Sequence, residues 1–194
     1  MNTRATNPDR HKKIEAAIVF FINKGFYATS MRDIANQANV SLLNLYTDFS
    51  GKQQLIAEVA ELERLDLQPV TEAFECMAAP NVEELMAVLS FYRALNVQKD
   101  WAILTAECFA DLARSSPLRP AFAATRRQLL EAFAAAIEQG ATRGTLRPGA
   151  DPRAIAQLLL DGVEAGALRE AIMADQDEGL QVVSHSLLRC LLSA

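Results

Sequence analysis

The sequence predicts an all-α fold of about nine helices, and three observations lead to that prediction. Apolar residues recur at helical spacing along the whole chain, whereas no stretch alternates apolar and polar residues between turns, as a half-buried strand does. Prolines, glycines and capping residues separate the helical segments from one another. With 51% hydrophobic residues among 194, the chain can bury a substantial core.

Helix boundaries in the N-terminal part follow from cap residues. The run 7–9 (Asn-Pro-Asp) is expected to open a first helix that Gly25 closes, because polar caps start helices and glycine often ends them. Ser30 and Asp33 have the spacing of a capping box for a second helix. Thr29 is the alternative cap of that helix.

The later boundaries are marked in the same way. A fourth helix is expected from near Lys52 past Phe74, with Pro80 ending the segment, because the residue before a proline avoids helical geometry. The sixth helix is expected to run through Ala113, and the seventh to stop at Gly140 and Gly144. Further helices are expected to begin at Asn81 with Glu84, at Asp100, at Ser116-Pro117, at Asp151-Pro152, and at Asp175 or Asp177.

Charge is divided unevenly along the chain. The whole sequence has a net charge of -5, which taken alone argues against a nucleic-acid partner. Up to Lys52, however, seven basic residues stand against four acidic ones, whereas the rest of the chain carries 12 basic and 20 acidic residues. A basic N-terminal part followed by an acidic remainder is the asymmetry expected when only the N-terminal part binds DNA.

Residues 29–52 have the pattern of two short helices joined by a tight turn. Ser41 is expected to cap the second of these helices, and Asn39 stands in the turn, where asparagine tolerates the left-handed backbone that is needed. This is the pattern of a DNA-binding helix-turn-helix. Its apolar residues and those of the first helix are expected to form a small core: Ile14, Ala17, Ile18, Phe21, Ile34, Ala35, Val40, Leu45 and Phe49.

The same segment resembles the N-terminal domain of TetR-family transcriptional regulators, in order and without gaps. The resemblance implies a homodimer whose N-terminal domains, residues 1–51, enter two successive major grooves of double-stranded DNA. It implies further that residues 52–194 bind an effector and dimerise through the last two helices. The residues that carry it are Ile14, Ala17, Phe20, Lys24-Gly25-Phe26, Ala28-Thr29-Ser30, Arg32-Asp33-Ile34-Ala35, Ala38, Val40-Ser41, Leu45-Tyr46, Phe49, Lys52 and Leu55.

The chain departs from the family pattern on and beside the second short helix. Asn39 replaces a common glycine, Leu42-Leu43 replace Lys-Gly, and Asp48 replaces histidine. The two leucines remove hydrogen-bonded base readout and favour contact with thymine methyl groups. Asp48 is expected to place a repulsive charge where the family often approaches phosphate. An operator sequence therefore does not carry over from the family.

The residues predicted to contact DNA are Thr29, Ser30, Arg32, Ser41, Leu42, Leu43, Asn44, Tyr46 and Lys52. By residue type and family position, Tyr46 and Lys52 would bind backbone phosphate and so position the protein. The first three would bind a flanking phosphate, and Asn44 would be the main hydrogen-bonding reader of bases. Taken singly, each residue could instead be a helix cap, a core residue or a solvated side chain that does not contact DNA.

Apolar side chains on the fourth to seventh helices could line an effector cavity, although any helical bundle buries such stripes. Glu107 lies among apolar neighbours, where a buried carboxylate would need a partner such as an effector amine or Arg114; a solvated position is the alternative. The effector is expected to be small and apolar or amphipathic. The predicted pocket is Phe74, Met77, Phe91, Tyr92, Trp101, Leu104, Glu107, Cys108, Phe109 and Phe122.

The last two helices supply the predicted dimer interface. Gly162 and Gly166 lie one turn apart and would let another helix approach closely. For each residue, intramolecular core is an equal alternative. The predicted interface is Leu158, Leu159, Gly162, Val163, Gly166, Val182, His185 and Leu188. A weaker resemblance to betaine-regulator-like TetR proteins covers residues 112–119, the alanine-rich seventh helix and the run 149–152.

Other classes of protein find little support in the sequence. It has no nucleophile elbow, phosphate-cradling glycine loop or paired-carboxylate motif, and two isolated histidines define no site, so we expect no enzyme, cofactor or metal. Cys76, Cys108 and Cys190 lack metal or disulfide spacing, and a thiol redox switch is a minor alternative. Without an apolar run of membrane length, we expect a cytoplasmic protein.

The leading hypothesis is a ligand-responsive regulator, a repressor by resemblance, that binds a palindromic operator as a dimer and is released by a small-molecule effector. The alternative is a helical protein-interaction module with degenerate DNA binding, which Leu42, Leu43 and Asp48 favour. Salt-dependent DNA affinity distinguishes these two hypotheses.

Overall fold

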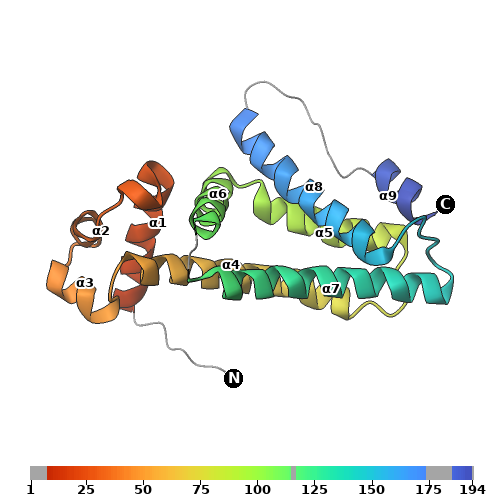
Figure 1. The fold of residues 1–194 in the computed structure, drawn as a ribbon, viewed down its shortest axis with the longest axis horizontal. Helices are drawn as coiled ribbons and strands as arrows, with labels where there is room; N and C mark the ends of the chain where they lie inside the picture. Colours follow the sequence, from red (N-terminus) through yellow and green to blue (C-terminus); the bar gives the residue numbers. More distant parts are fainter. Residues whose placement is uncertain (1–7, 115–116, 174–184, 194) are drawn as a thin grey trace. The chain divides into compact units, whose positions relative to one another are not determined.

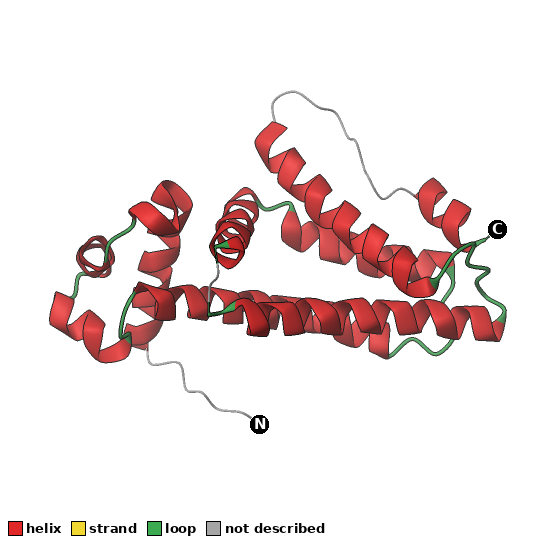
Figure 2. Cartoon of the chain, in the orientation of Figure 1, coloured by secondary structure: helices red, strands yellow, loops and turns green. Residues whose placement is uncertain are grey.

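The computed structural model describes residues 8–114, 117–173 and 185–193, and these residues form nine helices and no strand (Figures 1 and 2). The predicted all-α fold is confirmed. None of the described helices is long and apolar enough to cross a lipid bilayer. The helices are α1 (Pro8–Ala28), α2 (Met31–Ala38), α3 (Leu42–Asp48), α4 (Lys52–Glu75), α5 (Val82–Asn96), α6 (Lys99–Ala113), α7 (Arg119–Arg143), α8 (Pro152–Met173) and α9 (His185–Leu192).

The chain packs into two compact units. Unit 1 comprises Met1–Glu63 and Ile103–Arg119, and unit 2 comprises Arg64–Ala102 and Pro120–Ala194. Helix α4 thus gives its first half to unit 1 and its second half to unit 2, and most of α6 belongs to unit 1. The predicted boundary between residues 51 and 52 separates a DNA-binding part from an effector-binding part. It divides functions, not packing units, and stays a prediction.

Helices α1, α2 and α3 surround the small apolar core of unit 1. The rings of Phe21 and Phe26 meet edge to face there, with their centroids 4.6 Å apart. Ile18 and Val40 are only half-buried at the edge of this core. The other predicted members are buried as helical spacing indicated: Ile14, Ala17, Phe21, Ile34, Ala35, Leu45 and Phe49.

Local hydrogen bonds fix the starts of α2 and α3. Ser30 Oγ accepts from the Asp33 N–H at 3.1 Å, and the Asp33 carboxylate accepts from the Ser30 N–H at 3.1 Å, so the predicted capping box is present. Ser41 Oγ accepts from the Asn44 N–H at 3.1 Å. Asn39 has φ 55° and ψ 46° in the turn between the two helices. The predicted helix-turn-helix geometry is therefore confirmed.

Helix α1 breaks at Gly25, which the sequence predicts to be its end. The φ of 77° and ψ of 164° at this residue are non-helical, and one further turn reaches Ala28. A Cβ atom at Gly25 would lie 2.9 Å from Glu107 Oε1. Both the positive φ and the crowding favour glycine at this position.

The larger apolar core lies in unit 2, where α5 packs against α8 and α9. Phe74 of α4 stacks on Phe133 of α7 with ring centroids 4.4 Å apart. Gly140 does not stop α7 but lies inside it, where an added Cβ would come within 2.5 Å of Leu146. Gly144, with φ 76°, follows the last residue of the helix.

Two predicted helix starts are wrong by a few residues. Helix α6 begins at Lys99 and not after Asp100, because the Gln98 carbonyl already accepts from the Ala102 N–H at 2.9 Å. Helix α7 begins at Arg119, so Pro117 precedes the helix. The start expected at Asp175 or Asp177 lies outside the described residues.

Candidate functional site

Helix α3 turns one face to solvent and the other into the core of unit 1. Leu45 is fully buried, and the short helix is thereby seated on α1 and α2. Ser41 and Asn44 are exposed, as is Tyr46, and Leu43 is 78% exposed. Leu42 is half-buried. The structure thus places five of the predicted DNA-contacting residues on one short helix and its cap, and four of them are exposed.

At the start of α2, the predicted flanking residues separate into two kinds. Ser30 and Arg32 are exposed. Thr29 is only 2% exposed, and its hydroxyl donates to the carbonyls of Gly25 (2.8 Å) and Phe20 (3.2 Å). The Thr29 side chain therefore fastens the end of α1 from within the domain. Its hydroxyl hydrogen is engaged and its surface is covered in the free protein, so a contact of this side chain with DNA stays a prediction that its burial does not favour.

Lys52 at the start of α4 is bound to the backbone of the chain itself. Its ammonium donates to the carbonyls of Phe26 (2.5 Å), Tyr27 (3.1 Å) and Thr29 (3.0 Å). An ammonium has three donors, so all three are engaged at the end of α1. This contact places a positive charge where helix carbonyls carry partial negative charge.

Asp48 at the end of α3 is paired with a buried lysine. The Asp48 carboxylate accepts from Lys13 Nζ of α1 at 2.5 Å, and Lys13 is 2% exposed. The same ammonium lies 3.4 Å from the carbonyl oxygen of Asn44. The sequence predicts a repulsive charge at Asp48, and the structure adds that an internal cation is paired with this carboxylate. The effect of Asp48 on an approaching phosphate stays a prediction.

Glu107 of α6 accepts a 2.8 Å hydrogen bond from the backbone N–H of Phe26, just after the kink in α1. This backbone donor, and neither Arg114 nor an effector, is the partner that the structure gives to the carboxylate. The carbonyl of the same residue, Phe26, accepts from Lys52 of α4. Side chains from α4 and α6 thus hold the end of α1 from both sides within unit 1.

The residues predicted to line an apolar pocket are distributed over both packing units. Leu104, Glu107, Cys108 and Phe109 belong to unit 1, and the other predicted residues belong to unit 2. Phe91 and Phe109 are exposed, and the others are half-buried or buried: Phe74, Met77, Tyr92, Trp101, Leu104, Glu107, Cys108 and Phe122.

Tyr92 of α5 belongs to a polar cluster inside unit 2. Its phenol donates to the Glu164 carboxylate of α8 and accepts from Arg126 Nη1 of α7 at 2.8 Å. Arg126 and Glu164 also form an ion pair at 2.5 Å. Burial raises the pKa of Tyr92 well above its ordinary value, so the phenol keeps its proton and its donor.

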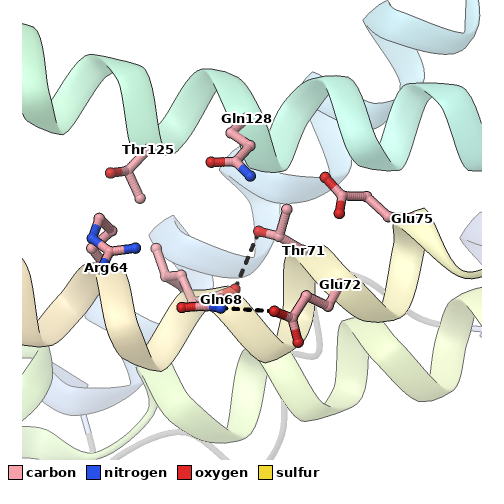
Figure 3. A pocket seen from close by; sticks show the side chains of 8 residues that line it. Arg64, Gln68, Thr71, Glu72, Glu75, Thr125 and Gln128 are labelled. Carbon is pink, nitrogen blue, oxygen red and sulfur yellow. Dashed lines mark hydrogen bonds between the residues drawn. The ribbon is translucent and has the colours of Figure 1, made fainter. Parts of the chain in front are cut away.

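A polar groove of about 180 Å³ lies between α4 and α7 in unit 2 (Figure 3). The Gln68 amide donates to Glu72 across its α4 side at 2.7 Å, and the Thr71 hydroxyl donates to the Leu67 carbonyl at 3.2 Å. None of the predicted pocket residues lines this groove. Its lining is Arg64, Leu67, Gln68, Thr71, Glu72, Glu75, Thr125 and Gln128.

The predicted dimer interface is only partly at the surface. Leu159, Val163 and Leu188 are buried in the core of unit 2, so for these three residues the alternative of intramolecular core holds. Leu158 is 57% exposed, and Leu168 further along α8 is 37% exposed. Gly162 and Gly166 are half-buried on α8. Val182 and the side chain of His185 lie outside the described residues.

Lys13 was missed by the sequence analysis, although the sequence held a signal for it. Lys13 lies one helical turn before Ala17 and beside Ile14, so it stands on the core-facing stripe of α1. A lysine at such a position is rarely buried without a partner. Its partner comes from another helix, and nothing in the local spacing identifies that partner.

Part of the chain matches a known family of proteins. Residues 14–59 match the sequence model described as "Bacterial regulatory proteins, tetR family". Among curated protein sequences, none matches this chain.

Three solved structures share the fold over nearly the whole chain. A TetR family transcriptional regulator from Pseudomonas syringae is 25% identical, with 95% of each chain covered and a TM-score of 0.70. GusR of Salmonella enterica is 19% identical, with 99% of each chain covered and a TM-score of 0.74. The regulator FadR from Bacillus subtilis, solved in complex with stearoyl-CoA, is 22% identical over 94% of this chain and 97% of that one, with a TM-score of 0.71.

Proposed function

Because residues 14–59 match the sequence model of bacterial regulatory proteins of the tetR family, we propose that this chain is a ligand-responsive transcriptional repressor. It acts in the cytoplasm as a homodimer, binds a palindromic operator, and is released from DNA by a small-molecule effector. The observation that carries the proposal is the exposed face of α3, where Ser41, Leu43, Asn44 and Tyr46 stand over the buried Leu45.

In the proposed complex, α3 of each protomer enters a major groove. Asn44 reads a base edge through its amide, and Leu43 contacts thymine methyl groups. Tyr46 donates its hydroxyl to a phosphate, and Arg32 at the start of α2 donates its guanidinium. The Ser30 hydroxyl donates to the Asp33 carboxylate at 2.8 Å in the free protein, so it exchanges that acceptor for a phosphate in the proposed complex. Lys52 contributes mainly by holding the end of α1, because its three donors are engaged there.

The dimer is proposed to form through the exposed side of α8. Leu158, Gly162 and Ala165 recur at spacings of four and three residues and so share one face of the helix. Small residues between leucines allow a second helix to approach closely. Two α3 helices related by a two-fold axis then require two half-sites about one helical turn apart, which is a palindrome.

Binding to DNA selected from a randomised duplex library tests the proposal. We expect enrichment of a palindrome, bound by two protomers with an affinity at least about 1,000-fold above that for random duplex. Enrichment of no sequence, together with weak binding that salt abolishes equally for every duplex, contradicts the repressor and favours the alternative of a helical interaction module. The exposed Leu43 is the observation that favours that alternative.

The effector is proposed to be small and apolar or amphipathic, and its site to lie in the helical body. Support comes from the FadR relative, which has been solved with stearoyl-CoA. The polar groove between α4 and α7 is a candidate for the polar part of such a ligand, because charged and amide side chains line it (Figure 3). A ligand there touches α4, whose first half belongs to unit 1.

A thermal-shift titration with stearoyl-CoA, stearate and coenzyme A as probes tests the effector class. A ligand that binds the folded state at 100 times its Kd stabilises it by about 2.7 kcal/mol. We expect an acyl-bearing probe to raise the Tm and to lower the affinity for the selected palindrome. A rise in Tm with unchanged DNA affinity would contradict the role of that ligand as effector.

A further inference from the structure

The end of α3 carries a charge pattern that an isolated helix would not favour. Asp48 puts a carboxylate at the C-terminus of a helix whose last turn holds no basic residue. Helix C-terminal carbonyls carry partial negative charge, so a carboxylate there is unfavourable and a cation is favourable. The required cation comes from α1, as Lys13.

Lys13 contacts α3 at two points that lie one turn apart. Its ammonium donates to the Asp48 carboxylate at 2.5 Å and lies 3.4 Å from the Asn44 carbonyl oxygen. Asn44 and Asp48 are separated by four residues and so share one side of the helix. The lysine therefore contacts the backbone of Asn44, which is proposed to read bases, and the side chain of Asp48 one turn later.

The burial of this pair makes its geometry rigid. Lys13 is 2% exposed, and the side chain of Asp48 is 27% exposed. A buried lysine has few alternative rotamers, and a partner left without it would carry an uncompensated charge. Thr47 adds a local contact, because its hydroxyl donates to the same Asn44 carbonyl at 2.5 Å.

We propose that Lys13 and Asp48 are positioning residues for DNA reading: their ion pair sets the rotation of α3 about its axis and neutralises the carboxylate that would otherwise face phosphate. This inference rests on the proposed function. It gives Asp48, which differs from the family pattern, a defined partner, and it makes the base preference depend on a residue that touches no DNA.

Substitutions at each of the two residues test the ion pair. Lys13→Met leaves the carboxylate uncompensated beside DNA, and we expect at least about a tenfold loss of affinity for the selected palindrome. Adding Asp48→Asn to Lys13→Met removes that charge, and we expect part of the affinity to return while the base preference stays altered, because the contact that sets the rotation of α3 is still missing. Asp48→Asn alone keeps an oxygen acceptor for the ammonium, so its base preference should match that of the wild type.

Asp48→Ala provides the test if Lys13→Met does not fold, since the half-exposed end of α3 tolerates truncation better than the core. We expect Asp48→Ala, but not Asp48→Asn, to change the base preference at the positions that Asn44 reads. Preference is measured by competition among palindromes with single base-pair changes. A merely structural pair would lower the Tm without changing this preference.

Arg10→Met is the matched control. Arg10 lies one turn from Lys13 on α1, pairs with Glu58 of α4 at 2.6 Å, and stacks over the Phe49 ring at 4.8 Å. Its hydrogen bonds go to Glu58, and it adds only a smaller electrostatic interaction with Asp48, so its loss should change base preference far less than Lys13→Met does. Equal effects of Arg10→Met and Lys13→Met on affinity and preference overturn the inference. Failure of the wild type to select any palindrome overturns the proposed function, and the inference falls with it.

Discussion

The carboxylate of Glu107 accepts a 2.8 Å hydrogen bond from the backbone N–H of Phe26, 81 residues earlier in the chain. The contact joins α6 to the end of α1 within unit 1, directly after the Gly25 kink. Lys52 binds the Phe26 carbonyl on the other side of the same residue. The end of α1, which precedes the proposed phosphate contacts at the start of α2, is therefore held by side chains of α4 and α6 within unit 1.

Gly25→Ala should destabilise this connection. An L-residue with φ of 77° and ψ of 164°, a region occupied almost only by glycine, costs about 1–3 kcal/mol, and the new Cβ would lie 2.9 Å from Glu107 Oε1. For a chain of this size, each kcal/mol lowers the Tm by roughly 2–4 °C. Gly51→Ala is the control, since a Cβ there meets no neighbour within 4 Å. Equal melting temperatures of the two variants would contradict the strained geometry at Gly25.

Glu107→Ala should leave the buried Phe26 N–H without its acceptor, at a cost of about 1–3 kcal/mol. Glu107→Gln keeps a carbonyl acceptor and should recover most of that loss. Denaturant unfolding of the three proteins measures the difference. If glutamine and alanine destabilise the protein equally, the hydrogen bond to Phe26 does not explain the contribution of Glu107.

Tyr46→Phe and Asn44→Ala should separate positioning from reading. Loss of the Tyr46 hydroxyl removes a proposed phosphate contact and should weaken binding to all duplexes, by roughly tenfold. Asn44→Ala should instead change which base pair is preferred. Tyr27→Phe and Asn23→Ala are the controls, since both residues are exposed but lie on α1. An unchanged preference in Asn44→Ala would remove its assignment as base reader.

Leu158→Glu should convert the proposed dimer into monomers, because it places a charge on the face of α8 that is proposed to pack against its copy. Light scattering coupled to size exclusion measures the mass. Leu43→Glu introduces the same change at an exposed leucine of α3 and should leave the mass unchanged while weakening DNA binding. A dimer that survives Leu158→Glu would show that α8 does not associate through this face.

The ion pair of Arg126 and Glu164 should behave as a coupled unit. Arg126→Met leaves the largely buried Glu164 carboxylate with the Tyr92 phenol but without its cation, and should cost about 3 kcal/mol. The further change Glu164→Gln should restore part of the stability, so the two effects are not additive. Thermal unfolding of the two single variants and the double variant measures the coupling. Additive losses would mean that the pair contributes no coupling energy.

Features set by neighbours in the sequence could be predicted well. The caps at Ser30 and Ser41 and the left-handed Asn39 depend on residues no more than three or four positions away, so their spacing carried the information. The start of α7 was misplaced, because proline is tolerated before a helix as well as in its first turn.

Contacts between distant helices could not be predicted. Lys13 with Asp48 and Glu107 with Phe26 join segments whose separation in sequence says nothing of their distance in space. Helical spacing identified apolar positions on α8, but Leu159 faces the core and Leu158 faces solvent. Periodicity finds an apolar stripe, whereas only the fold determines which part of it the chain itself covers.

The central claim is that α3 reads a specific DNA sequence, and fluorescence anisotropy with the selected palindrome and a scrambled duplex across a salt series tests it most directly. We expect tight, saturable binding of a dimer to the palindrome, weaker binding to the scrambled duplex, and a decline of log affinity with log salt for both. Equal affinity for the two duplexes at every salt concentration would contradict the account.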